Sequence, residues 1–257
     1  MKNRSLAVLL LSLLVTSSAS SASLSDFFKK KSGAEAPVSL ASLSQDQVVT
    51  GLKEALTTGV RQAVTNLGKE GGFLQDVSVK IPMPENVSKI EKALRAAGQG
   101  KLVDDFVMTM NRAAEQAVPE AAAVLAESVK QMSIADAKSV LTGTNEAATQ
   151  YFRRTSETTL RERFLPIVKA ATGKTGVTSA YKQMTDKAGG AWGGVLGNLG
   201  STYLGKMPDL DSYITAKALD GLFLKVAEQE KLIRANPVAR TTDILKKVFG
   251  AVKPSSQ

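Results

Sequence analysis

Apolar residues recur every three or four positions through most of the chain, and this spacing constrains the fold more than any other feature. Residues that would share one helix face are Val48, Leu52, Leu56, Val60, Val64 and Leu67. Ser44 precedes this run and Gln47 follows Ser44 by three residues, as in a capping box, while Gly68 ends the run. The pattern therefore predicts a helix over 44–67 with one face in a protein core.

The same periodicity predicts further helices joined by short links. They cover approximately 87–97, 102–117, 119–132, 133–143, 144–152, 160–173, 210–226 and 241–250. Pro119 suits the first position of a helix, and Ser133 with Asp136 forms a second capping signature. The segment 210–226 is apolar nearly all round, which indicates a helix surrounded by others.

One short segment has strand periodicity instead. Val77, Val79 and Ile81 alternate with polar residues before a proline at 82, which favours a short half-buried strand. We therefore expect a mainly α protein, a single multi-helix domain over 43–250 with at most one short strand or hairpin near residues 75–82.

The N-terminus has the features of a secretory signal peptide. Lys2 and Arg4 precede an apolar centre over 6–15 and then a cluster of Ser and Ala. The apolar centre has about ten residues, whereas a membrane-spanning helix needs roughly 20. We expect residues 1–22 to be removed by cleavage after Ala22; cleavage after Ala19, or a signal that stays attached, are the alternatives. The predicted location is the periplasm or the exterior, with no transmembrane segment after cleavage.

Three segments lack helical periodicity. Residues 23–42 contain three consecutive lysines and predict a flexible basic leader, which is either solvated or in electrostatic contact with membrane or wall. Residues 187–206 contain seven glycines and no charge between the flanking lysines, which predicts a Gly-rich surface loop; the alternative is a loop that docks on a partner or covers a pocket. Residues 251–257 predict a frayed tail.

The chain is basic, and this charge bears on its partners. Loss of residues 1–22 removes two cations and no anion, so the formal charge falls from +9 to +7. A positive surface favours anionic partners. Nucleic acid is disfavoured because of export and because only 5% of residues are aromatic, whereas single-strand binders use aromatic platforms. The expected partner is an envelope lipid, a cell-wall polymer or another envelope protein; the oligomeric state is left open.

The sequence contains neither His nor Cys, and this excludes several chemistries. It removes nucleophile pairs that depend on histidine, zinc sites of the usual His/Cys type and disulfides. We therefore predict no metal and no cofactor. Carboxylate, lysine, tyrosine or serine chemistry remains possible.

The candidate site consists of polar residues set in apolar segments, which either bind a ligand or form a buried polar network. They are Asn111, Arg112, Glu115, Asp211, Tyr213, Lys217, Asp220, Arg234, Asn236 and Arg240. One interpretation is a solvated helix face with pairs inside one helix. The other is that Asn111, Arg112 and Glu115 meet C-terminal residues in the interior, where a charge must be paired. Around a cavity, Glu115 and Asp220 would be the acid and base, and Lys217 and Arg234 the anion ligands.

Several stretches resemble domain-of-unknown-function family forty-one ninety-seven, a group of exported bacterial proteins. They are Met110–Glu115, Tyr151–Arg153, Leu210–Phe223, Ile233–Thr242 and Lys246–Gly250. The similarity covers roughly 43–250. The resemblance implies export and a helical fold, and it implies no activity, cofactor or catalytic residue.

Two functions follow as hypotheses. The first is a non-enzymatic envelope protein, a binding or scaffold module for an anionic or apolar partner. The alternative is a hydrolase or lyase that uses carboxylates and lysine, with a polar cavity around Glu115, Lys217 and Asp220.

Overall fold

The computed structural model describes residues 44–174 and 209–235, all of which belong to one compact unit. Its α-helices are α2 (Gln45–Gly68), α3 (Ser88–Ala96), α4 (Gly100–Ala117), α5 (Ala121–Gln131), α6 (Ile134–Thr142), α7 (Ala147–Lys174) and α10 (Leu210–Ala235). Single 3-10 turns span Glu85–Val87 and Val118–Glu120. No strand forms within these residues, so the predicted mainly α domain is confirmed. The signal segment, the leader, the Gly-rich loop and the predicted helix 241–250 lie outside the described residues.

Both predicted capping boxes are present. The Ser44 hydroxyl accepts a hydrogen bond from the Gln47 backbone, and the Gln47 side chain accepts one from the Ser44 backbone. Ser133 and Asp136 make the same reciprocal pair at the start of α6. Each box satisfies backbone donors that would otherwise lack a partner in the first turn. Local sequence thus sets where these two helices begin.

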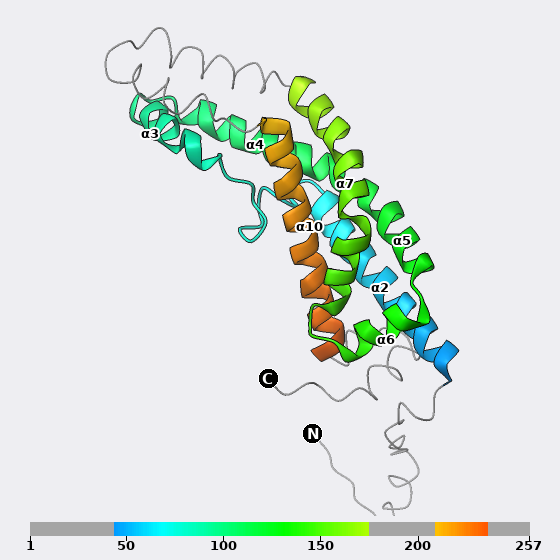
Figure 1. The fold of residues 1–257 in the computed structure, drawn as a ribbon. Helices are drawn as coiled ribbons and strands as arrows, with labels where there is room; N and C mark the ends of the chain where they lie inside the picture. The colour runs from blue at the N-terminus through cyan, green and yellow to red at the C-terminus, as the bar shows by residue number, and fades with distance from the viewer. Residues whose placement is uncertain (1–43, 175–208, 236–257) are drawn as a thin grey trace, which may run out of the picture. The chain divides into compact units, whose positions relative to one another are not determined.

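The core lies where α10 meets α7, α4 and α2, and Figure 1 shows α10 (orange) running beside α7 (yellow-green). α2 packs against α5 on another side. Among the largest fully buried side chains are Phe73, Met110, Phe152, Phe164 and Phe223. The apolar circumference predicted for 210–226 is thus largely explained by helices on several sides of α10.

α7 is one continuous helix where the sequence indicated two. The polar interval 153–159 stays helical, and Arg153, Glu157 and Arg161 form successive i,i+4 ion pairs along it. Pro166 lies inside the helix although it has no backbone donor. Phe164 and Val168 on either side of Pro166 are fully buried. Their burial offsets the missing hydrogen bond, so tertiary packing overrides the local signal.

The segment 69–84 between α2 and α3 is a folded loop, and the strand favoured by its alternating pattern does not form. Its backbone makes turns, such as the hydrogen bond from Lys80 N to Asp76 O. Val79 and Ile81 are buried as the alternation indicated, but Val77 is 91% exposed. The backbone groups of Ile81 bond to the side chain of Asn111 and not to a neighbouring strand.

No helix in the described ranges is long and apolar enough to cross a membrane.

Two helical glycines provide a matched test of the packing. A Cβ at Gly59 would lie 3.5 Å from Ile233, an ordinary contact, whereas a Cβ at Gly221 would lie 2.8 Å from a ring carbon of Phe73. Gly59→Ala should stabilise the protein by about 0.5–1 kcal/mol through helix propensity. Gly221→Ala should destabilise it by about 1–3 kcal/mol, because the buried Phe73 must move. Urea unfolding measures both; equal effects would contradict the close approach of loop 69–84 to α10.

Candidate functional site

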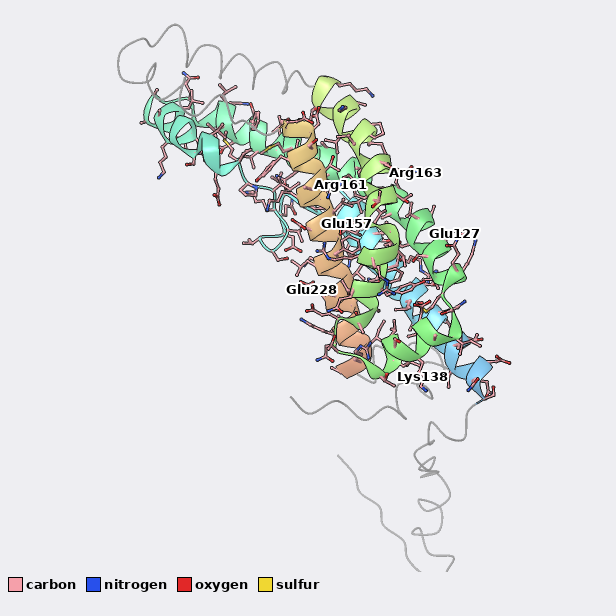
Figure 2. All side chains as sticks on the ribbon, viewed as in Figure 1. Glu127, Lys138, Glu157, Arg161, Arg163 and Glu228 are labelled. Carbon is pink, nitrogen blue, oxygen red and sulfur yellow. The ribbon has the colours of Figure 1, made fainter. Side chains whose placement is uncertain are left out.

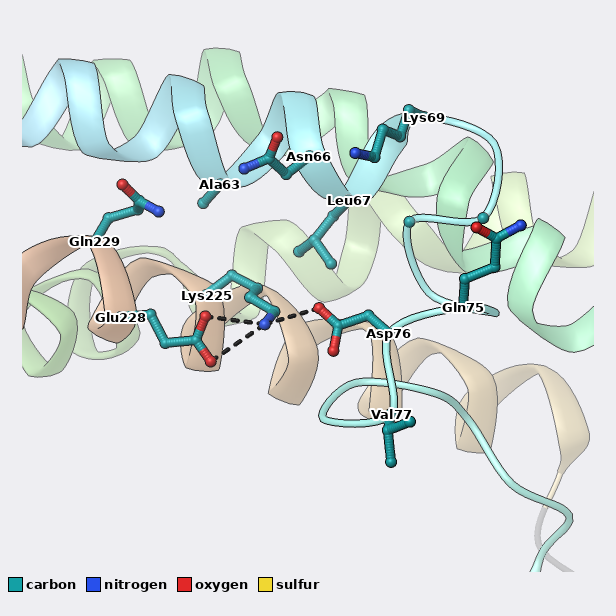
Figure 3. Close-up of a pocket in the computed structure, with 12 residues that line it drawn as sticks. Ala63, Asn66, Leu67, Lys69, Gln75, Asp76, Val77, Lys225, Glu228 and Gln229 are labelled. Carbon is teal, nitrogen blue, oxygen red and sulfur yellow. Dashed lines mark hydrogen bonds and ion pairs between the residues drawn. The ribbon is translucent and has the colours of Figure 1, made fainter. Parts of the chain in front are cut away.

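A polar cleft lies between the C-terminal part of α2, the first half of loop 69–84 and α10 (Figure 3). Its volume is about 520 Å³, which falls within the range of ~300–1,000 Å³ typical of small-ligand sites. Its lining residues are Ala63, Asn66, Leu67, Lys69, Gly71, Gly72, Gln75, Asp76, Val77, Lys225, Glu228 and Gln229. This cleft is the candidate functional site.

Two glycines allow the chain to turn into the cleft wall after α2. Gly71 has a φ of 81°, in the left-handed region that side chains disfavour. A Cβ at Gly72 would collide with the backbone oxygen of Leu67. The turn therefore depends on glycine at both positions.

Glu115 on α4 fixes the start of the loop. Its carboxylate accepts hydrogen bonds from Phe73 N at 3.1 Å and Leu74 N at 3.3 Å, and its side chain is only 5% exposed. Arg112 pairs with Glu115 at 2.7 Å and reaches Glu70 at 2.6 Å. Both carboxylate oxygens of Glu115 are thus engaged in holding the wall of the cleft.

Asn111 fixes the other end of the same loop. Its side-chain oxygen accepts a hydrogen bond from Ile81 N at 2.8 Å, and its amide nitrogen donates to Ile81 O at 2.9 Å and to Val107 O at 2.8 Å. Tyr213 on α10 donates from its hydroxyl to Pro82 O at 3.1 Å. Burial, and to a lesser extent the charge of Glu85, raises the pKa of Tyr213. The loop is thereby held by α4 and α10 together.

Lys225 is the central charge of the cleft. Its ammonium lies 2.8 Å from an Asp76 oxygen and 2.9 Å from a Glu228 oxygen, and its side chain is 16% exposed (Figure 3). Desolvation acts to lower the pKa of Lys225, but the hydrogen bonds to Asp76 and Glu228 outweigh it and raise that pKa. The hydrogen bond from Lys225, followed by that from the Ser78 hydroxyl, lowers the pKa of Asp76 to about 2.

The contact between Asp76 and Lys225 should make the stability of the protein depend on pH. The pKa of Asp76 is depressed in the folded state, so its contribution to stability is present above its ordinary pKa of 3.8 and is lost as the pH falls towards about 2. Lys225→Met should return the pKa of Asp76 towards 3.8, as followed by NMR of the carboxyl carbons. Asp136 is the control, because its pKa is lowered mainly by the hydrogen bond from Ser133 and Lys225 is not among the causes. An unmoved Asp76 titration would contradict the contact.

The remaining polar side chains of the cleft have no partner in the part of the chain that the structure describes. Asn66, Gln75 and Gln229 make no side-chain hydrogen bond within the described ranges, and the ammonium of Lys69 makes no ion pair there. Figure 3 shows Asn66 and Gln229 on opposite walls, with Gln75 at the end where the loop turns. Among the described residues, the donors and acceptors of these side chains remain available to a ligand in the cleft.

A separate polar cluster joins α6, α7 and α10 away from the cleft. Glu230 accepts hydrogen bonds from Ala148 N, Thr149 N and the Thr149 hydroxyl, each at 3.0 Å. Arg234 pairs with Glu230 at 2.8 Å and donates to Val140 O at 2.7 Å. This cluster satisfies the donors at the start of α7 and an acceptor near the end of α6.

Asp211, another predicted site residue, belongs to a third contact. It accepts a hydrogen bond at 2.7 Å from the Thr172 hydroxyl, which joins the end of α7 to the start of α10.

The predicted meeting of Glu115 with Lys217 and Asp220 does not occur. Lys217 and Asp220 are exposed; Asp220 lies 3.8 Å from Arg153, and Lys217 lies 6.0 Å from the ring of Tyr213. These two residues occupy the solvent-facing stripe of α10, because the core takes its opposite face. Asn236 and Arg240 lie outside the described residues.

Sequence reasoning missed Asp76, Lys225 and Glu230, and only weak signals could have found them. Lys225 is a charge set among the apolar residues of α10, and Glu230 stands four residues before Arg234, a spacing that favours an ion pair. In the described part of the chain no group of acidic side chains is arranged to hold a metal ion.

Comparison with known proteins identifies one family. A family described as "Protein of unknown function (DUF4197)" matches residues 42–250. No curated protein and no solved structure matches the chain. The match covers α2 to α10, including Asn111, Glu115 and Lys225, so both the cleft and its supports lie inside it. Because the match spans most of its 257 residues, the chain belongs to the DUF4197 family.

Proposed function

We propose that this protein is an exported, non-enzymatic binding module and that the cleft around Lys225 is its binding site. The observation that carries the proposal is a cavity of about 520 Å³ lined by side chains that have no partner among the described residues. Such a site binds through a few placed polar groups. The loop that forms one wall is fixed by Asn111 and Glu115, so the site is formed before a ligand arrives.

The positions of Glu115, Lys217 and Asp220 favour a binding site over the hydrolase or lyase chemistry of the alternative hypothesis. The carboxylates of Glu115 and Glu230 are buried, and both oxygens of each accept structural hydrogen bonds. A general acid or base must be within hydrogen-bond reach of the substrate. Lys217 and Asp220, the other residues of the enzymatic hypothesis, lie on an exposed helix face away from the cleft lining.

The N-terminal sequence supports export. Its basic start, short apolar centre and small residues match a signal peptide, so the envelope is the proposed place of action. The formal charge of +7 that remains after residues 1–22 favours residence near anionic polymers or lipids.

Native mass spectrometry tests this function. The chain is produced with its own N-terminus and recovered from the periplasm, and we expect a bound envelope compound that survives gentle ionisation. Lys69→Ala with Gln229→Ala should reduce its occupancy at least tenfold. The matched control is Lys138→Ala with Gln150→Ala, two exposed side chains outside the cleft, of which Lys138 is labelled in Figure 2.

Two results would contradict the proposal. Equal occupancy in the cleft variant and the control would place the ligand elsewhere, and conversion of the bound compound during incubation would favour the enzymatic alternative. Recovery only from the cytoplasm would contradict export.

A further inference from the structure

Resting on the proposed function, we infer that the ligand of the cleft is a short peptide with a free amino group and a free carboxylate. The inference rests on three features of the cleft: its primary amides, the separation of its charges, and a lining in which the described residues include no aromatic ring.

The primary amides match the peptide unit. Asn66 comes from α2, Gln75 from the loop and Gln229 from α10, so they surround the cleft on three sides (Figure 3). A primary amide offers two donors and one acceptor group, which complement the C=O and N–H of a main chain. Because none has a side-chain partner within the described ranges, binding a peptide would break no hydrogen bond between these amides and the described residues.

The charges of the cleft are separated. Lys225 with Asp76 and Glu228 form a group of three charges whose sum is −1, and the hydrogen bonds of Lys225 are directed at the two carboxylates. Lys69, at the end of α2, carries a positive charge with no ion-pair partner in the described residues. A ligand with an ammonium near the acidic group and a carboxylate near Lys69 would meet opposite charges at both ends.

The apolar residues of the cleft limit the kind of side chain that the ligand can have between its charged ends. Ala63, Leu67 and Val77 are the apolar side chains among the lining residues that the structure describes. Val77 is 91% exposed, whereas Ala63 and Leu67 are each 1% exposed and present almost no surface to a ligand. No aromatic residue is among the described residues that line the cleft, so planar rings such as nucleobases would find no stacking partner among them. Among these residues the exposed apolar surface is therefore limited to Val77, which suits a ligand whose side chains are small. A neutral glycan would leave both charged ends unused.

The size of the cavity limits the peptide. An extended chain rises about 3.3 Å per residue, and the cavity holds about 520 Å³. Three extended residues span about 10 Å, a length that suits a cavity of this volume, so we choose a tripeptide of small residues as the probe.

Calorimetry with trialanine tests the inference on the full mature chain. We expect saturable binding of trialanine, at least tenfold weaker binding of N-acetyl-trialanine, and at least tenfold weaker binding of trialanine amide. Lys69→Ala should weaken trialanine tenfold and abolish the difference between trialanine and its amide, because Lys69 is the partner of the carboxylate. Lys138→Ala should leave all three affinities unchanged. Circular dichroism verifies that each variant is folded.

The outcomes separate this inference from the proposed function. Equal binding of the free and blocked peptides, or no binding of any of them, overturns the peptide assignment. If the compound recovered from the periplasm still depends on Lys69 and Gln229, the binding function stands and only the ligand class is wrong. If nothing is recovered and no peptide binds, both fail.

Discussion

Replacing Glu230 with alanine is expected to lower the free energy of unfolding by about 3 to 5 kcal/mol, the usual effect of breaking a buried ion pair. The Glu230 side chain is 5% exposed and receives backbone hydrogen bonds from Ala148 and Thr149 at the start of α7. Its loss leaves these two buried donors without their acceptor, at about 1–3 kcal/mol each, and removes the carboxylate that pairs with Arg234. α6, α7 and α10 all depend on this one side chain.

Equilibrium urea unfolding measures this effect as a shift in midpoint at constant slope. Glu127→Ala is the control, since Glu127 is 56% exposed on α5 (Figure 2) and should change stability by no more than about 0.5 kcal/mol. The double change at Glu230 and Arg234 should cost less than the sum of the single changes, because the two residues interact. A loss below about 1 kcal/mol for Glu230→Ala would show that the carboxylate does not cap α7.

Asn111→Asp is expected to destabilise the protein by about 3 kcal/mol at neutral pH while changing almost no volume. The amide nitrogen of Asn111 donates to Ile81 O and Val107 O, and a carboxylate would place a charge against both acceptors. An unsatisfied or repelled buried charge costs several kcal/mol. Burial raises the pKa of the introduced carboxyl, so its protonated form is favoured in the folded state.

The loss of stability caused by Asn111→Asp should depend on pH. A raised pKa in the folded state means that the stability deficit is smallest below the unfolded value of about 3.9 and grows as the pH rises through the folded value. The deficit should therefore shrink between pH 7 and pH 4. Asn66→Asp, at an exposed position of α2, is the control and should show little effect. A deficit independent of pH would contradict the donor role of Asn111.

The helices could be predicted because their signals are local. Ser44 with Gln47 and Ser133 with Asp136 determine two helix starts within four residues, and the apolar spacing of α4 determines which face is buried. α7 was divided wrongly because its polar middle also packs against the core, where Ser156 is 2% exposed, and no local pattern shows this packing. The strand failed for the same reason, since Ile81 bonds to Asn111, 30 residues away.

The candidate site was predictable only in part. The motif containing Asn111, Arg112 and Glu115 marked a real cluster, but its role became evident only when Glu115 was seen to hold Phe73, 42 residues away. Lys225 and Asp76 come together from the two ends of the described chain, and neither has a sequence motif. Exposure of Lys217 and Asp220 could not be deduced either, because it depends on how α10 is rotated against α7 and α2.

The contact of α10 with α2 also determines when the molecule can fold. α2 is the first described helix and α10 the last, so the core closes only after the ribosome has made residues up to about 235. Contacts between residues far apart in sequence slow folding, because a long loop must close before they form. For a protein that we propose is exported, this delay keeps the new chain threadable through a translocation pore. If the protein is exported as proposed, α2 and α10, which form two walls of the cleft, come together only after translocation.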